Sequence, residues 1–206
     1  MRIACLHTAA SHQNTFNALF AEQAPEAGIV HVVREDLLAR SQVGGLHAVT
    51  EDTMAALGAL GQADAVLCTC STLGPLVDAI QNRKYIRIDR PAMEAAVMHG
   101  PKPLLALCLE STRAASAELL EDVGEDDLTP TIHMCEEAWP YFVEGKLDGF
   151  ADMIAGSVAQ AAEGHDCVIL GQASMACAAK PLSGLGIPVL ATPERAVARA
   201  IAVATT

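Results

Sequence analysis

The chain has 206 residues, of which 51% are hydrophobic and 3% are aromatic, so Ala, Val, Leu and Ile must build most of a packed core. The net charge is −12 and no cluster of Lys and Arg is present, which excludes a nucleic-acid-binding protein of the basic kind. No segment approaches the ~20 apolar residues that a bilayer-spanning helix needs, and the first residues are typical of a strand rather than a signal peptide. Seven scattered cysteines favour reduced thiols and a cytoplasmic location.

Short apolar runs alternate along the chain with longer helical patterns. The runs predict strands at residues 3–6, 28–33, 65–68, 85–88, 104–108, 128–134, 167–170 and 188–190. The helical patterns cover residues 15–24, 48–60, 91–99, 111–122, 145–162 and 193–203. This alternation predicts an α/β fold of βαβ units, with mainly parallel sheets and helices on both faces.

An internal similarity suggests that the fold has two related halves. Residues 64–72 resemble residues 166–174, since each segment has an Asp, an apolar strand and a turn of small polar residues. Residues 3–9 and 104–112 form a second, looser pair. We predict a first half of residues 1–94 plus 190–206 and a second half of residues 95–189.

The residues that follow the predicted strands are the candidate site, because open α/β sheets bind ligands at the carboxyl ends of their strands. Several of them would lie at helix N-termini, whose free N–H groups favour a carboxylate or phosphate. Hydroxyl groups at such positions either cap the helix or bind the anion. The set comprises His7, Thr8, Cys70, Ser71, Thr72, Ser111, Thr112, His133, Gln172, Ala173 and Ser174.

Cys70 is the sharpest candidate in this set. A thiol at a helix N-terminus is expected to have a lowered pKa, and its thiolate can remove a proton from carbon or return one. The alternative is a buried cysteine that packs as a small hydrophobe. We prefer that second interpretation for Cys5, Cys68, Cys108, Cys135, Cys167 and Cys177. The Cys68-Thr69-Cys70 segment has no second cysteine pair at metal-ligand spacing, so no metal site is expected.

Residues 64–74 resemble the first signature of the aspartate/glutamate/hydantoin racemase superfamily, in which an apolar strand ends in Cys-Asn-Thr or a close variant. Residues 85–93, 104–118 and 168–176 are similar to later segments of that family, in the same order. The resemblance implies two flavodoxin-like parallel-sheet halves related by a pseudo-two-fold axis, with the active site in the cleft between them. It also implies a reaction without cofactor or metal, in which two cysteines flank the substrate α-carbon.

The second cysteine of that pattern is replaced in this chain by Gln172. An amide is neither an acid nor a base near neutral pH, so Gln172 can only form hydrogen bonds, for example to the oxygens of an enediolate. His7 and His133 follow or end strands and are candidates for the missing acid or base. The alternative for each histidine is a structural role in the core or a loop, which we favour.

We therefore expect an isomerase of the racemase type that acts at the carbon α to a small carboxylate, with Cys70 as acid/base or nucleophile. Ser71, Thr72, Thr8, Ser111, Thr112, Ala173 and Ser174 would bind the substrate. Two alternatives stay open: a single-thiol decarboxylase and a non-catalytic protein that binds small carboxylates. Members of the family often dimerise, so a homodimer is a further expectation, without nucleic-acid or membrane partners.

Overall fold

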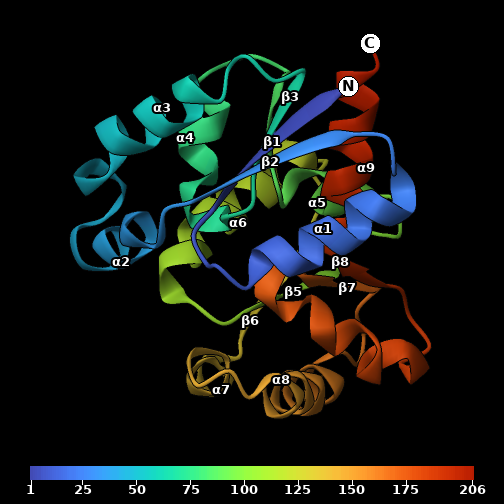
Figure 1. Cartoon of the computed structure of the whole chain (residues 1–206). Coiled ribbons are helices and arrows are strands. Elements are labelled where there is room, and N and C mark those ends of the chain that lie inside the picture. The colour runs from blue at the N-terminus through green and yellow to red at the C-terminus, as the bar shows by residue number, and fades with distance from the viewer. The chain divides into compact units, whose positions relative to one another are not determined.

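A computed structural model describes residues 1–206 and contains two separate parallel β-sheets of four strands each (Figure 1). Contacts between residues divide the chain into two compact units. The first comprises Met1–Ile88 and Pro193–Thr206, and the second comprises Asp89–Thr192. None of the helices combines the length and the hydropathy that a bilayer crossing requires.

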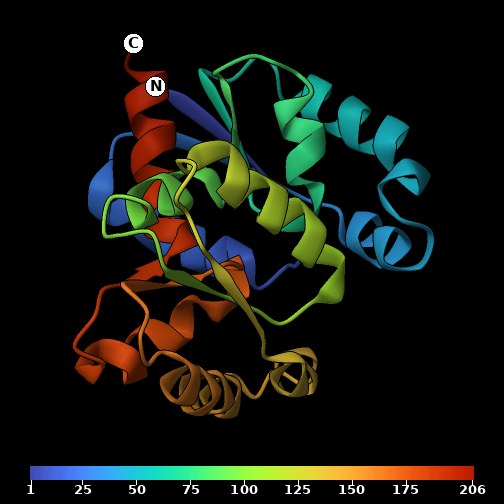
Figure 2. The same ribbon diagram turned by 180° about the vertical axis from the view of Figure 1, so that it is seen from behind.

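The first unit contains a sheet with the strand order β2-β1-β3-β4. Its strands are β1 (Arg2–His7), β2 (Gly28–Val33), β3 (Ala65–Cys68) and β4 (Tyr85–Arg87). Its helices are α1 (His12–Gln23), α2 (Glu35–Gly44), η1 (Leu46–Ala48), α3 (Thr50–Ala59), η2 (Ser71–Leu73), α4 (Gly74–Asp78) and α9 (Thr192–Ala204). Helices α2, α3 and α4 cover one face of this sheet, while α1 and α9 cover the other (Figures 1 and 2).

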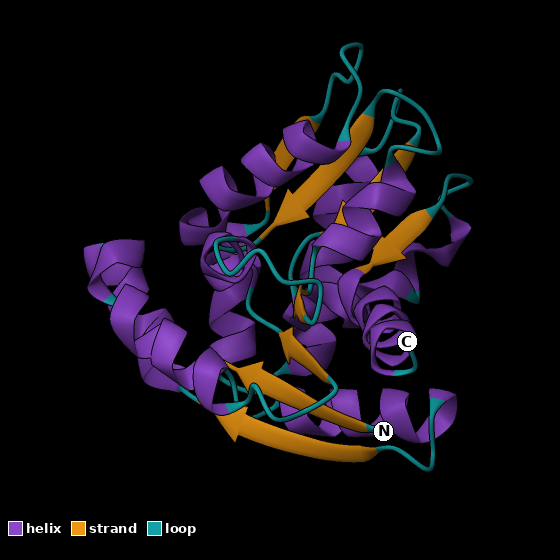
Figure 3. Cartoon of the chain, turned by 90° about the horizontal axis from the view of Figure 1, so that it is seen from above, coloured by secondary structure: helices purple, strands orange, loops and turns teal.

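The second unit repeats this plan with the strand order β6-β5-β7-β8. Its strands are β5 (Pro103–Leu107), β6 (Thr131–Met134), β7 (Cys167–Leu170) and β8 (Val189–Ala191). Its helices are α5 (Arg90–Ala96), α6 (Glu110–Val123), η3 (Glu136–Ala138), α7 (Trp139–Val143), α8 (Leu147–Ala161), η4 (Ala173–Ala179) and η5 (Pro181–Gly184). Helices α5 and α6 pack on one face of the sheet, and α7, α8 and η4 pack on the other. Figure 3 shows helices flanking the strands in this way.

The predicted α/β class is confirmed, and a strand is present at each of the eight predicted positions. The central strands β3, β5 and β7 are buried along their whole length, which explains why they are continuous apolar runs rather than alternating ones. Three helices were not predicted: α2, α4 and α7. Two of these have only five residues, too few for a helical period to be visible in the sequence. The predicted boundaries of the two halves, residues 1–94 plus 190–206 and residues 95–189, stay a prediction. The first of the two compact units described above also combines an N-terminal segment with the C-terminal helix.

The two similar sequence segments occupy equivalent places in the two sheets. Asp64 accepts a hydrogen bond from the Arg2 backbone N–H at 2.7 Å, just before β3. Asp166 accepts the corresponding bond from the Lys102 N–H at 2.8 Å, just before β7. In each unit, therefore, an Asp side chain ties the start of the third strand to the start of the first. The similarity reflects a shared structural role as well as a shared pattern of strand and turn.

Candidate active site

Cys70 lies in the turn that follows β3, where the backbone changes from strand to helix. Its backbone is extended, with φ −116° and ψ 111°, and it directly precedes η2, which continues into α4. The preceding Thr69 N–H still bonds to the Leu6 carbonyl, so the turn begins only when the sheet ladder ends. This geometry places the side chain of Cys70 at the carboxyl edge of the first sheet, as the sequence predicts.

Four donors surround the Cys70 thiol. They are the hydroxyls of Thr8 and Thr72 and the backbone N–H groups of Thr72 and Leu73. Each of them lowers the pKa of the thiol, because each stabilises a thiolate. The structure thus brings together Thr8 and Cys70, which are 62 residues apart in the sequence, and leaves Ser71 buried beside them.

The expectation of a lowered pKa at Cys70 is wrong. Burial raises the pKa of this thiol, and the four donors only partly offset that effect. The side chain is 6% exposed and packs with Leu6 and Leu73, so a thiolate there is poorly solvated. The helix that follows is also short, with three residues of η2 and five of α4, so few peptide dipoles act on the sulfur.

Gln172 occupies the equivalent turn of the second sheet. It follows β7 as Cys70 follows β3, has an extended backbone with φ −125° and ψ 145°, and directly precedes η4. Its Oε1 atom accepts hydrogen bonds from the backbone N–H groups of Cys108 at 2.5 Å and Leu109 at 3.1 Å. These N–H groups lie just before α6, so the glutamine oxygen closes the β5–α6 turn. Because two donors point at this atom, the orientation of the amide is fixed, and Nε2 is the end that can donate to a ligand.

The strand registers also align the remaining candidates of the two units. Ile3 pairs with Ala65 in one sheet, and Pro103 pairs with Cys167 in the other. Counted from these pairs, Thr8 corresponds to Cys108 and Thr72 to Ser174. The second unit therefore does have a cysteine at its sheet edge, but on the β5 turn rather than on the β7 turn. Cys108 is 1% exposed, and burial and the nearby Cys135 and Cys177 raise its pKa strongly, so it is a poor acid or base.

Four further candidates lie near Gln172 in the second unit. Ser111 and Thr112 are in the first turn of α6, two and three residues after Leu109, whose N–H group Gln172 binds. Ala173 is buried at the start of η4 and Ser174 is half-buried next to it. The sheet edge of this unit therefore collects hydroxyl groups and a helix N-terminus, as predicted from the sequence.

The two candidate histidines have structural partners. His7 is fully buried and lies against Thr69 and His31, with 2.8 Å from Nδ1 to Thr69 Oγ1 and 2.8 Å from Nε2 to His31 Nδ1. His133 lies within β6, and its Nε2 is 2.7 Å from the Ser157 hydroxyl of α8.

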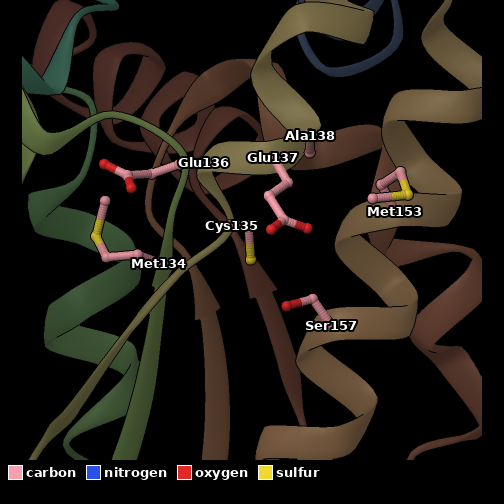
Figure 4. A pocket seen from close by; sticks show the side chains of 7 residues that line it. All are labelled: Met134, Cys135, Glu136, Glu137, Ala138, Met153 and Ser157. Atoms are coloured by element: carbon pink, nitrogen blue, oxygen red, sulfur yellow. The ribbon is translucent and has the colours of Figure 1, made fainter.

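A pocket of about 310 Å³ lies at the end of β6 and was not predicted. Figure 4 shows that Cys135, Glu137 and Ser157 point toward one another inside it. Ser157 contacts both His133 and Cys135. Burial raises the pKa of the Cys135 thiol, and the hydrogen bond with Ser157 partly offsets that effect. The sequence signal for this pocket was present in the Cys135-Glu136-Glu137 run, but Ser157 comes from α8 and no local pattern connects the two.

Comparison with known proteins gives a consistent fold. No protein-family model matches the sequence, and no curated protein is significantly similar to it. Among solved structures, a glutamate racemase of Bacillus anthracis matches with a TM-score of 0.77 and 15% identity, over 98% of this chain and 81% of that one. An allantoin racemase of Pseudomonas fluorescens matches with a TM-score of 0.72 and 18% identity, over 100% of this chain and 91% of that one. An aspartate racemase of Picrophilus torridus matches with a TM-score of 0.69 and 13% identity, over 99% of this chain and 94% of that one.

The chain shares the fold of these three structures. The expectation of two α/β halves, each with a parallel sheet, is thereby confirmed. At these identities the likeness establishes the architecture and not the reaction. Cys70 and Gln172 occupy equivalent turns of the two sheets, and their side chains have different chemistry.

Proposed function

We propose that this chain is a cofactor-independent isomerase of the racemase type, which acts at the carbon α to a small carboxylate with Cys70 as the acid/base. The observation that carries the proposal is the set of four donors around the Cys70 sulfur. Hydroxyl and N–H groups directed at one buried sulfur stabilise its anion, which a thiol with only a packing role does not need. The racemase fold supports the same conclusion, since the neighbouring structures are racemases of glutamate, aspartate and allantoin.

In the proposed first step, the Cys70 thiolate removes the α-proton of the substrate. An S–H bond forms, the C–H bond breaks, and its electron pair moves into the adjacent carboxylate to give an enediolate. The hydroxyls of Thr8 and Thr72 and the N–H groups around the sulfur hold the thiolate before this transfer. The proposed donors to the substrate oxygens are Ser71, Ser111, Thr112, Ser174 and the backbone of Ala173.

Gln172 has a proposed role as an electrostatic donor. Its oxygen is already bound to two N–H groups, and its Nε2 group contacts no protein acceptor. An amide N–H fixed by two hydrogen bonds on its other end is preorganised, so it can stabilise the developing negative charge on an enediolate oxygen at little cost in reorganisation. The amide cannot supply a proton to carbon, so Gln172 does not replace a second thiol.

A site with a single thiol predicts a specific stereochemical outcome. When the Cys70 thiol exchanges its proton with solvent and then protonates the face from which the proton was taken, a solvent hydrogen replaces the α-hydrogen and the configuration is retained. Inversion requires a proton on the opposite face, from water or from a residue other than Gln172. We therefore expect exchange to be faster than inversion, unlike a two-thiol racemase.

The test is α-hydrogen exchange in deuterium oxide with a panel of glutamate, aspartate, allantoin, 2-hydroxy acids and arylmalonates. We expect deuterium uptake with at least one carboxylate, and loss of at least about 10²-fold in rate for Cys70→Ala, which is the usual contribution of a positioned acid/base. The matched control is Cys177→Ala, because Cys177 is the exposed cysteine of the chain. Exchange that survives Cys70→Ala would refute the thiol assignment.

The same panel distinguishes the alternatives. Release of carbon dioxide from a malonate without exchange of amino-acid α-hydrogens would identify a single-thiol decarboxylase instead. Saturable binding of a carboxylate without exchange or turnover would identify a binding protein. The free state of all seven cysteines fits the reducing cytoplasm that we propose as the location.

A further inference from the structure

Three metal-ligand side chains meet on the α1 face of the first sheet, away from the Cys70 turn. Cys5 and His7 are two residues apart on β1, so they point to the same face of the sheet. His31 pairs directly with Cys5 across β1 and β2. The Cys5 sulfur and one nitrogen of each histidine all lie within 4.8 Å of one another.

We propose that Cys5, His7 and His31 form a binding site for a single thiophilic divalent cation such as Zn²⁺. One thiolate and two neutral imidazoles are ligands that Zn²⁺ prefers. Zinc bonds of about 2.3 Å to sulfur and about 2.0 Å to nitrogen require ligand atoms about 3.3–3.6 Å apart in a tetrahedron. The two imidazole nitrogens are 2.8 Å apart at present, so they need to separate by only about 0.5 Å.

The outer hydrogen bonds of the two imidazoles match those of metal-bound histidines. His7 Nδ1 lies 2.8 Å from Thr69 Oγ1, and His31 Nε2 lies 2.9 Å from Asn17 Oδ1. Metal-bound histidines nearly always donate their second N–H to an oxygen in this way, which fixes the tautomer and aims the other nitrogen at the ion. Here the two inner nitrogens face each other at 2.8 Å, and the Cys5 sulfur lies within 4.8 Å of one nitrogen of each imidazole.

With the Asn17 amide in its present orientation, a cation between the imidazoles satisfies every contact of the network, whereas a neutral pair breaks one of them. The Thr69 hydroxyl is also placed to donate to the Leu6 carbonyl at 3.2 Å. If His7 Nε2 carries the shared proton, then Thr69 must donate to His7 and loses Leu6. If His31 Nδ1 carries it, then His31 Nε2 is a bare acceptor that faces the oxygen of Asn17. A neutral pair therefore breaks one contact or reverses the Asn17 amide, whereas a cation leaves both outer N–H groups free to donate.

Burial makes this cluster suitable for a closed metal site. Cys5 and His7 are fully buried and His31 is half-buried, so an ion among them would exchange its water ligands for protein ligands. The Cys5 thiolate would offset one of the two positive charges of the ion, and the two imidazoles would bind it as neutral donors.

An ion has a route to this site. Strand β2 is at the edge of the sheet, His31 is half-buried and Asn17 is exposed. Phe16 and Phe20 of α1 are fully buried and cover the inner side, with the Phe16 ring 5.4 Å from the His7 ring. The site is thus closed toward the core and accessible from the β2 edge. Occupancy would also fix His7, which directly precedes Thr8, one of the donors to Cys70.

The test uses the full chain after treatment with a chelator. Titration with Co²⁺ should produce a sulfur-to-cobalt charge-transfer band that saturates at one ion per chain. Calorimetric titration with Zn²⁺ in buffers of different ionisation enthalpy should show release of about one proton, which comes from the Cys5 thiol. His31→Gln and Cys5→Ser should lower the affinity ~100-fold or more, and Asn17→Ala, which removes an outer partner, ~10–100-fold.

Matched controls make the result decisive. Cys177→Ser and His47→Gln change an exposed cysteine and an exposed histidine, and both should leave the cobalt band unchanged. Should Cys5→Ser fail to fold, the exposed Asn17→Ala and the edge variant His31→Gln still test the site. The proposal is overturned if no band forms, if the band depends on Cys177, or if the imidazole pair is found to hold only a proton. These readouts do not depend on turnover, so they stand apart from the function proposed above.

Discussion

Replacement of Gln172 by Ala is a direct test of the two hydrogen bonds that the Gln172 oxygen accepts in the second unit. The change removes the only side-chain acceptor of the Cys108 and Leu109 N–H groups. Cys108 is 1% and Leu109 is 8% exposed, so neither group is well solvated. The substitution also removes the oxygen that closes the turn into α6, a role comparable to an N-cap.

The expected destabilisation can be estimated from these two groups. A buried N–H that loses its partner costs about 1–3 kcal/mol, and loss of a cap costs about 0.5–2 kcal/mol for the same contact. Gln172 is 8% exposed, so a water molecule can enter the space and accept from both groups. We therefore expect a loss of about 2 kcal/mol in the free energy of unfolding, at the lower end of the sum for two N–H groups.

Urea unfolding measures this loss, and amide hydrogen exchange locates it. Exchange at Cys108 and Leu109 should accelerate in Gln172→Ala, whereas Gln172→Glu retains an acceptor at the α6 N-terminus and should be less destabilised. Gln42→Ala, on the exposed surface of α2, serves as the control and should change stability by less than about 0.5 kcal/mol. Equal stability of Gln172→Ala and Gln42→Ala, with unchanged exchange, would refute the reasoning.

Three further predictions concern pH and packing. The pKa values of His7 and His12 are lowered to about 3 and about 4 by burial, from 6.5, so the folded chain binds fewer protons than the unfolded chain between these values. In chelator-treated protein, the free energy of unfolding should therefore have its full value above pH 6.5 and decrease as the pH falls toward 4, because the unfolded chain binds protons first. A free energy of unfolding that does not change over this range would contradict the burial of these rings. Because burial raises the pKa of Cys70, the α-exchange rate should still be rising above pH 8.5, the usual pKa of a free thiol, as the thiolate forms; a plateau already at pH 7 would contradict this. Gly171→Ala would place a Cβ 2.6 Å from Leu107 Cδ2 and 2.8 Å from Leu105 Cδ1, and should cost about 1–3 kcal/mol in thermal or urea unfolding. Gly156→Ala, in α8 with nothing within 4 Å of the new Cβ, should instead stabilise by about 0.5–1 kcal/mol, and equal effects at the two glycines would refute the packing argument.

The sequence by itself determined the order of the eight strands, the positions of six of the nine α-helices and the location of the candidate turn. Fully buried parallel strands have to be apolar along their whole length, so runs such as residues 65–68 and 167–170 were visible without any tertiary information. The repeated Asp before each of these strands was also visible, as a similarity between the two segments. Its side chain acts on the neighbouring strand start in both units, so the residue type recurs with the structure.

The tertiary structure decided the properties that depend on residues far apart in the chain. Whether Cys70 has a lowered or a raised pKa depends on how deeply Leu6 and Leu73 bury it, and no local spacing reports that depth. The sequence placed Gln172 at the second turn, but only the fold showed that its oxygen is used by the β5–α6 turn and that Nε2 is the available end. His7 became a member of a Cys5–His7–His31 cluster only when β1 and β2 were paired, because the register between two strands brings the ligand atoms together.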